Sequence, residues 1–127
     1  MSKARILLVE DNEQNRFLAT FLLEQAGLKV VHATNGPQGL EKARTENPDL
    51  VLLDIQLPGI DGYEVFKKMQ EDPELRKIPV VAVTSYAMQG ERQKTFDMGF
   101  AGYLEKPINV SSFAKQVTAF LPNGGGQ

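Results

Sequence analysis

Short apolar runs alternate with longer segments of helical periodicity along this chain. The runs occupy residues 6–9, 30–31, 50–53 and 80–83, and a fifth, weaker candidate lies at residues 103–104. Runs of this length, rich in leucine and β-branched residues, are typical of strands that are covered on both faces of a parallel sheet. The pattern therefore predicts five strands.

The segments between these runs place apolar residues three and four positions apart, which is the spacing of one helix face. The positions predicted to face the core are Leu18, Phe21 and Leu22 in the first segment, Val65, Phe66 and Met69 in the third, and Phe113, Val117, Phe120 and Leu121 in the last. The fourth segment, near residues 90–98, has the weakest pattern, and Phe96 is its main apolar residue.

Glycine, asparagine and proline mark where these helices begin and end. Gly27 is expected to end the first helix, because glycine readily adopts the left-handed conformation that follows many helices. Asn35 is expected to cap the second helix, with Pro37 in its first turn, and Asn109 is expected to cap the last helix.

Five repeats of strand and helix predict an α/β fold, in which a doubly wound, five-stranded parallel sheet carries five helices on its two faces. A chain of 127 residues fits one domain. We expect this domain to span residues 1–121, followed by a flexible, glycine-rich tail at residues 122–127.

Composition excludes several kinds of site. The absence of cysteine excludes disulfides, Cys-ligated zinc and thiol catalysis. A net charge of −2 without a basic cluster argues against nucleic acid or an anionic membrane as the main partner. No apolar run approaches the roughly 20 residues of a bilayer span, and the start does not resemble a secretory signal, so we expect a cytoplasmic protein.

Polar residues follow four of the five predicted strands at their carboxyl ends. Glu10 and Asp11 follow the first strand, Asp54 the third, Thr84 the fourth and Lys106 the fifth. Taken alone, each has an ordinary interpretation as a loop acid, a turn residue, a strand-end hydroxyl or a surface charge. Because ligands of an open parallel sheet bind at this edge, their coincidence favours a functional site.

The carboxylates of Glu10, Asp11 and Asp54 would repel one another unless a positive charge lay between them. A hard divalent cation with oxygen ligands meets this need, and Mg²⁺ keeps several waters, so that a few protein oxygens suffice. The single histidine, His32, lies on the second predicted strand, and with no cysteine present it argues against zinc.

Four motifs occur in a fixed order along the chain: Ile6-Leu7-Leu8-Val9-Glu10-Asp11-Asn12, Leu52-Leu53-Asp54-Ile55-Gln56-Leu57-Pro58-Gly59-Ile60-Asp61-Gly62, Val81-Ala82-Val83-Thr84 and Lys106-Pro107. Each alone is weak, but together, at this spacing, they resemble the response-regulator receiver domain over about residues 4 to 121. The resemblance implies a flavodoxin-like sheet with strand order 2-1-3-4-5.

The resemblance also implies a metal site and a phosphoacceptor. Asp54 would accept a phosphoryl group from a histidine kinase or a histidine phosphotransfer protein. Mg²⁺ would be held by Glu10, Asp11, the Asp54 carboxylate and the backbone carbonyl of Gln56. Thr84 and Lys106 would bind phosphoryl oxygens.

Further positions follow from the same resemblance. Tyr103 matches an aromatic residue that turns inward on phosphorylation, although an ordinary half-buried strand aromatic is nearly as good an interpretation. The Lys106-Pro107 bond is expected to be cis. Ser85 stands where the family mostly has alanine or glycine, and Gln56 and Tyr86 occupy variable positions that tune hydrolysis of the acyl phosphate.

The implied function is a switch of two-component signalling, similar to bacterial cell-cycle type regulators and to hybrid-kinase receivers. We expect no output segment after the domain, so that the switch would act either by protein binding through the fourth helix, fifth strand and fifth helix, or by onward phosphoryl transfer. The chain would catalyse only its own phosphorylation and dephosphorylation. One alternative is a receiver-like module that is never phosphorylated, although such modules typically lose Asp54. A Mg²⁺-dependent phosphohydrolase is the other, but it usually needs a second aspartate where Gln56 stands.

Overall fold

Five parallel strands form the centre of the molecule. The structure, a computed structural model, describes residues 3–85 and 89–121. The strands in this part of the chain are β1 (Arg5–Val9), β2 (Lys29–Ala33), β3 (Leu50–Asp54), β4 (Val80–Thr84) and β5 (Gly102–Glu105). They pair in the order β2-β1-β3-β4-β5, and every pair is parallel. The predicted fold class and strand order are confirmed.

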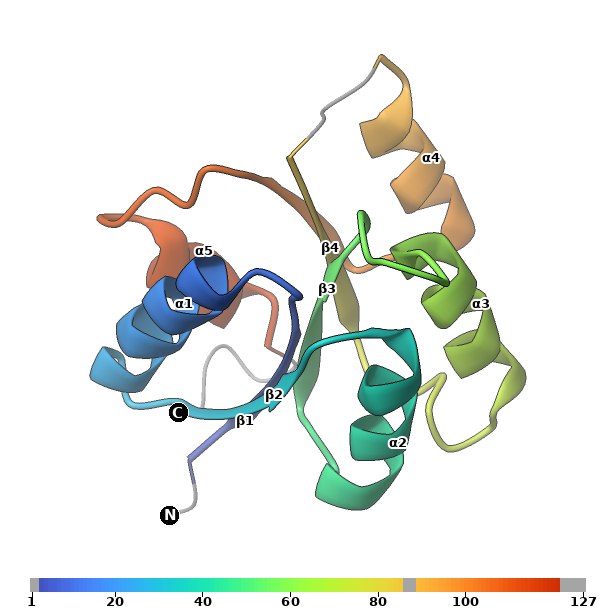
Figure 1. The fold of residues 1–127 in the computed structure, drawn as a ribbon, viewed down its shortest axis with the longest axis horizontal. Helices are drawn as coiled ribbons and strands as arrows, with labels where there is room; N and C mark the ends of the chain where they lie inside the picture. The colour runs from blue at the N-terminus through green and yellow to red at the C-terminus, as the bar shows by residue number, and fades with distance from the viewer. Residues whose placement is uncertain (1–2, 86–88, 122–127) are drawn as a thin grey trace.

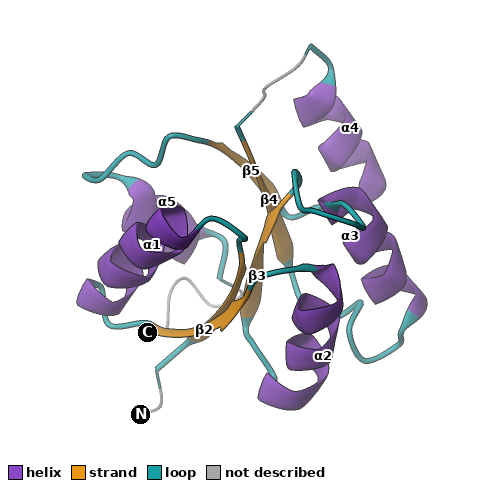
Figure 2. Ribbon diagram, viewed as in Figure 1, coloured by secondary structure: helices purple, strands orange, loops and turns teal. Residues whose placement is uncertain are grey.

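Helices cover both faces of this sheet, as Figures 1 and 2 show. The helices of the described residues are α1 (Glu13–Gln25), α2 (Gly36–Glu46), α3 (Gly62–Glu71), α4 (Glu91–Met98) and α5 (Phe113–Ala119). Helices α1 and α5 lie on one face, and α2, α3 and α4 lie on the other (Figure 1). Within the described ranges, no helix is long and apolar enough to cross a bilayer.

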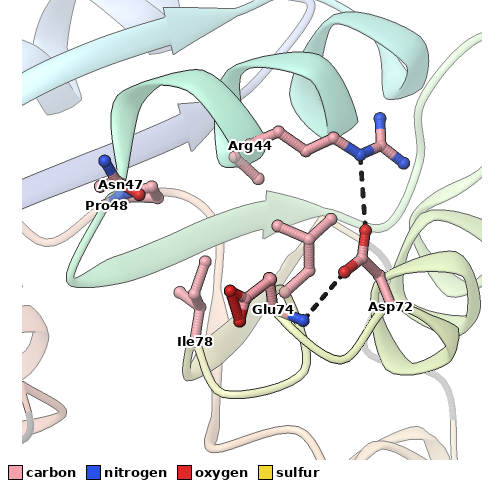
Figure 3. Close-up of a pocket in the computed structure, with 8 residues that line it drawn as sticks. Arg44, Asn47, Pro48, Asp72, Glu74 and Ile78 are labelled. Atoms are coloured by element: carbon pink, nitrogen blue, oxygen red, sulfur yellow. Dashed lines mark hydrogen bonds and ion pairs between the residues drawn. The ribbon is translucent and has the colours of Figure 1, made fainter.

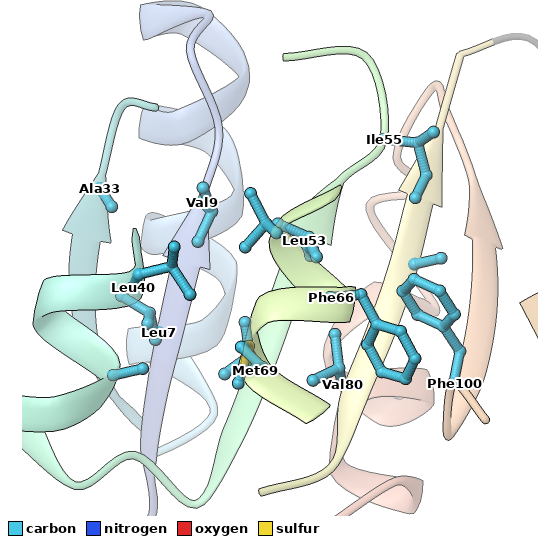
Figure 4. Close-up of a cluster of buried hydrophobic side chains, with 14 of the residues drawn as sticks. Leu7, Val9, Ala33, Leu40, Leu53, Ile55, Phe66, Met69, Val80 and Phe100 are labelled. Atoms are coloured by element: carbon cyan, nitrogen blue, oxygen red, sulfur yellow. The ribbon is translucent and has the colours of Figure 1, made fainter. Parts of the chain in front are cut away.

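Two apolar cores, one on each face, hold the sheet in place. Every residue of β3 and β4 is buried, as the continuous apolar runs predict. On the face of α2 and α3, Leu53 and Met69 belong to one cluster with Phe66 and Phe100, whose rings stack 3.9 Å apart (Figure 4). Burying one such side chain contributes about 1.5–3 kcal/mol. The strand ends therefore extend from a well-packed base.

Side-chain caps fix the starts of three helices. The side chains of Asn12, Asn35 and Asp61 each accept a hydrogen bond from a backbone N–H in the first turn of α1, α2 and α3. The cap predicted at Asn35 is confirmed. Gly27, with φ at +90°, follows the end of α1 as expected.

The cap predicted at Asn109 is wrong. Helix α5 begins at Phe113, and Ser112 occupies its N-cap position. The Asn109 carboxamide oxygen instead accepts hydrogen bonds from the N–H and the hydroxyl of Ser111. Asparagine side chains readily form such local turns in competition with a helix. The turn therefore precedes the helix.

Two predicted core residues lie at the surface. Phe21 is 50% exposed because the buried stripe of α1 runs through Ala19, Leu22 and Leu23, on the other side of the helix. Phe96 is 74% exposed, and the buried residue of α4 is its neighbour Thr95. The Thr95 hydroxyl donates to the carbonyl of Arg92 within the helix, which removes most of the penalty for burying it.

Candidate functional site

The register of the parallel strands brings the predicted site residues to one edge of the sheet. Val9 pairs with Leu53 and Asp54 pairs with Val83, so Glu10 follows β1 directly beside the end of β3. Thr84 ends β4, and its carbonyl accepts the backbone N–H of Lys106 at 2.8 Å. Four strands thus deliver their end residues to the same edge, as the sequence predicts.

Three carboxylates meet there. Glu10 and Asp54 are 4% and 3% exposed, whereas Asp11 is exposed. One oxygen from each lies within 4.8 Å of the others. Such a set of close oxygen donors, two of them buried, fits a hard divalent cation such as Mg²⁺, which prefers carboxylate oxygens and retains several waters. The acidic cluster predicted from the sequence is therefore present.

Lys106 neutralises part of this charge. Its ammonium lies 2.6 Å from Glu10 Oε1 and 3.1 Å from Asp54 Oδ2, and all three side chains are almost fully buried. Burial by itself lowers the pKa of Lys106, but the hydrogen bond with Glu10 and the charge of Asp54 outweigh this, and the net shift is upward. The lysine therefore stays charged inside the site.

The Asp54 carboxyl group binds its proton more tightly than an ordinary aspartate does. Burial, and then the charge of Glu10, raise the pKa of Asp54 to about 6. The ammonium of Lys106 and the N–H of Gln56 act in the opposite direction. Added positive charge among these carboxylates favours the ionised form, which is the form that can act as a nucleophile.

Thr84 lies beside Asp54 with no exposed surface. The side-chain amide of Gln56 donates from Nε2 to Thr84 Oγ1 at 2.6 Å, and its oxygen accepts the N–H of Ser85 at 3.0 Å. The sequence assigns only the backbone carbonyl of Gln56, so this side-chain contact was missed. A contact between residues 28 positions apart leaves no periodic signal in the chain.

Tyr103 is buried on β5, and its hydroxyl donates to Glu91 Oε1 at 2.9 Å. The Tyr63 hydroxyl from α3 donates to the other oxygen of Glu91 at 3.1 Å. Burial and the Glu91 carboxylate raise the pKa of Tyr103 and raise that of Tyr63 to about 12. Glu91, at the start of α4, thus links that helix to both tyrosines, and neither Glu91 nor Tyr63 was predicted.

Two smaller expectations concern the loops around the site. The Lys106-Pro107 bond is cis, as expected. Ser85 is exposed at the end of β4, and Tyr86 lies outside the described residues, as does the predicted tail.

A separate hollow of about 480 Å³ lies at the amino ends of β3 and β4, opposite the carboxylates (Figure 3). Arg44 forms an ion pair with Asp72 beside it at 3.5 Å, and Pro48 and Ile78 supply apolar walls. None of the residues predicted to form the site lines this hollow. The size of this hollow is therefore no reason to place the functional site there and not at the edge that carries the carboxylates.

A comparison with known protein families shows which family the chain belongs to. The sequence profile of the response regulator receiver domain matches residues 6–118. The chain belongs to this family. The receiver domain is 42% identical over 116 residues to the polar-differentiation response regulator DivK of Brucella anthropi, covering 91% of this chain and 94% of DivK.

Solved structures of other receivers have the same fold. A CheY-like response regulator receiver domain from Methanospirillum hungatei superposes with a TM-score of 0.85 at 29% identity, covering 97% of each chain. The chemotaxis response regulator CheY4 of Vibrio cholerae gives a TM-score of 0.86 at 26% identity, covering 94% of this receiver domain and all of CheY4.

Proposed function

We propose that this receiver domain is a phosphorylation switch of two-component signalling and that Asp54 accepts the phosphoryl group. The observation that carries the proposal is the buried Asp54 carboxylate, which contacts the Lys106 ammonium at 3.1 Å and lies beside Glu10 and Asp11. Family membership and similarity to DivK support the same function.

In the proposed reaction, a carboxylate oxygen of Asp54 attacks the phosphorus of a phosphohistidine. The P–N bond breaks, the released imidazole nitrogen takes up a proton, and an acyl phosphate forms on Asp54. Phosphoryl transfer depends mainly on positioning and charge. The Gln56 N–H donates to Asp54 Oδ1 at 2.9 Å, and the Lys106 ammonium lies 3.1 Å from Asp54 Oδ2. Lys106 and the hydroxyl of Thr84 would donate to the oxygens of the incoming group.

The acidic cluster is proposed to hold Mg²⁺. The ligands would be the carboxylates of Glu10, Asp11 and Asp54 and the backbone carbonyl of Gln56. When bound, Mg²⁺ supplies positive charge to the phosphoryl oxygens. Glu10 is orientated for this by the N–H of Asn12, which donates to Glu10 Oε2 at 3.1 Å.

The phosphoryl donor would be a histidine kinase or a histidine phosphotransfer protein. Its histidine has to reach the edge of the sheet that carries Asp54, next to the first turns of α1. Phe17 and Phe21, one helical turn apart on α1, are 73% and 50% exposed, and Val110 is 63% exposed in the loop after β5. These apolar side chains suit a protein partner that covers the site while it delivers the phosphoryl group.

The output is proposed to use the face of α4, β5 and α5. Ala82 pairs with Tyr103, and strand side chains alternate, so Thr84 and Tyr103 extend from the same face of the sheet on neighbouring strands. A movement of Thr84 toward a phosphoryl group would therefore change the packing around Tyr103. A cavity of about 210 Å³ beside Tyr103, lined also by Arg92, Ile108 and Gln116, gives a downstream protein a place to bind.

The same contacts weigh against the alternatives. A phosphohydrolase of this type would use a second acid at position 56. The residue there is Gln56, whose neutral amide forms hydrogen bonds with Thr84 and Ser85. A module that is never phosphorylated has no need to bury Asp54 against Lys106. The proposal includes catalysis only of the domain's own phosphorylation and dephosphorylation, and a cytoplasmic location, where such phosphodonors act.

Intact-mass spectrometry with Mg²⁺ and acetyl phosphate tests the proposal. One phosphoryl adduct is expected on the wild-type protein, none on Asp54→Asn, and one on Asp97→Asn, which changes an exposed aspartate of α4 in the same way. An adduct on Asp54→Asn equal to that of the wild type would refute the assignment of the acceptor.

A further inference from the structure

The side chain of Gln56, which follows β3, contacts the last residue of β4 and the residue after it. Its Nε2 donates to Thr84 Oγ1 at 2.6 Å, and its Oε1 accepts the backbone N–H of Ser85 at 3.0 Å. The backbone N–H of Gln56 donates to Asp54 Oδ1 at 2.9 Å. One residue therefore contacts both the proposed acceptor and the hydroxyl beside it.

The contact with Ser85 fixes which way the amide faces. A backbone N–H can only donate, so the group that faces Ser85 must be the amide oxygen. The amide nitrogen must then face Thr84, where it can only donate as well. The Thr84 hydroxyl consequently accepts from Gln56 and cannot direct its own proton there.

The polarity of this bond matters for what Thr84 can do. A hydroxyl has one proton to donate and two lone pairs with which to accept. Phosphoryl oxygens accept hydrogen bonds, so Thr84 can help only by donating its proton. A donor in a chain of hydrogen bonds is strengthened when its own oxygen accepts another bond.

We propose that Gln56 is a positioning residue that acts through Thr84, holding the threonine hydroxyl so that its proton is directed to the phosphoryl group on Asp54. The chain of donors would run from the Gln56 amide to the Thr84 hydroxyl and on to a phosphoryl oxygen. This role belongs to the side chain of Gln56 and is separate from its backbone carbonyl, which is proposed as a metal ligand. The inference rests on the proposed function of Asp54.

The variant Gln56→Met removes the amide while keeping a side chain of similar length. Gln70→Met, at an exposed position of α3, is the matched control. The probe is fluoroberyllate in the presence of Mg²⁺, a phosphoryl mimic that coordinates a carboxylate oxygen reversibly and needs no phosphoryl transfer. The readouts are its apparent affinity, the affinity for Mg²⁺ alone, and the thermal unfolding of each variant.

Because Gln56→Met loses the hydrogen bond to the Thr84 hydroxyl, we expect it to bind fluoroberyllate about five- to tenfold more weakly than the wild-type protein does. Mg²⁺ affinity is expected to match that of Gln70→Met, and thermal unfolding is expected to fall below it only by the loss of the two Gln56 side-chain hydrogen bonds. Thr84→Ala is expected to weaken binding as well, and adding Gln56→Met to Thr84→Ala is expected to have no further effect, because the two residues act in series.

Three results would overturn the inference. They are unchanged or tighter fluoroberyllate binding by Gln56→Met, a loss in the double variant equal to the sum of the two single losses, or an equal loss in Gln70→Met. Failure of the proposed function would look different, since the wild-type protein would then form no adduct with acetyl phosphate and bind no fluoroberyllate.

Discussion

Helices α3 and α4 lie side by side on one face of the sheet, but different forces hold them there (Figure 1). Helix α3 buries Val65, Phe66 and Met69, and the side chain of Asp61 caps it. Helix α4 buries only Thr95, and no side chain caps its start at Gly90. Apolar burial fixes the first helix, whereas the second has the partly buried Met98 against the core at its end and polar contacts at its first turn.

Those polar contacts centre on Glu91. Its two carboxylate oxygens accept from Tyr63 of α3 and Tyr103 of β5. The guanidinium of Arg92 lies 4.8 Å from the ring centroid of Tyr103, and the Lys94 ammonium lies 4.0 Å from that of Tyr63. Such contacts can be exchanged for others without opening the core. The difference in packing leads us to propose that α4 is the element that shifts, while α3 keeps the site in place.

The largest effect is expected from Phe66→Ala on α3. The variant leaves a cavity beside Phe100, whose ring stacks on Phe66, and should reduce the free energy of unfolding by about 3–5 kcal/mol. The matched change Phe96→Ala on α4 should stay within about 0.5 kcal/mol of the wild type, since that side chain is exposed. Urea denaturation of both variants measures the difference, and equal losses would remove the contrast between the helices.

A smaller and more local effect is expected from Glu91→Ala. Each lost hydrogen bond to the carboxylate is worth about 1.5–3 kcal/mol at most, and the exposure of the site reduces this. Amide hydrogen exchange should become faster in α4 but not in α3. Glu64→Ala, in the first turn of α3, is the control. Faster exchange in both helices, or in neither, would argue against a role for Glu91 in holding α4.

The smallest effect concerns tyrosine ionisation. Burial and Glu91 raise the pKa of Tyr63 to about 12, and that of Tyr103 is raised as well. The two protonated tyrosines stabilise the folded state. Their contribution to the free energy of unfolding is fully present below the usual tyrosine pKa of about 10 and is lost as the pH rises through the pKa values of the folded protein. Glu91→Gln, in a Tyr86→Phe background, should therefore ionise its tyrosines at lower pH than the background protein. Coincident titration curves, followed by tyrosinate absorbance, would contradict this.

The strand-end residues could be predicted from the sequence because parallel register is a simple rule. Once residues 50–53 form a strand, Asp54 has to lie at its carboxyl edge, and the same reasoning places Glu10 and Lys106 there. Local chemistry likewise predicted the cap at Asn35. These features depend on short stretches of chain whose neighbours are fixed by topology.

Contacts between distant side chains could not be predicted in this way. Gln56 meets Thr84, and Tyr63 meets Glu91, across 28 positions in each case, and no spacing rule connects them. The errors at Phe21 and Phe96 have a related origin. In each helix the pattern predicts that the aromatic residue faces the core, but the helix buries a smaller neighbour, Leu22 in α1 and Thr95 in α4, and the aromatic ring faces outward.

Hydrogen exchange before and after phosphorylation is the most direct test of a switch in which Asp54 moves α4 while α3 stays fixed. The protein would be compared with and without acetyl phosphate in Mg²⁺, beside Asp54→Asn treated in the same way. We predict altered exchange in α4 and around Tyr103, unaltered exchange in α3, and no change in Asp54→Asn. An adduct on Asp54 with identical exchange in α4, or with an equal change in α3, would contradict the proposed switch.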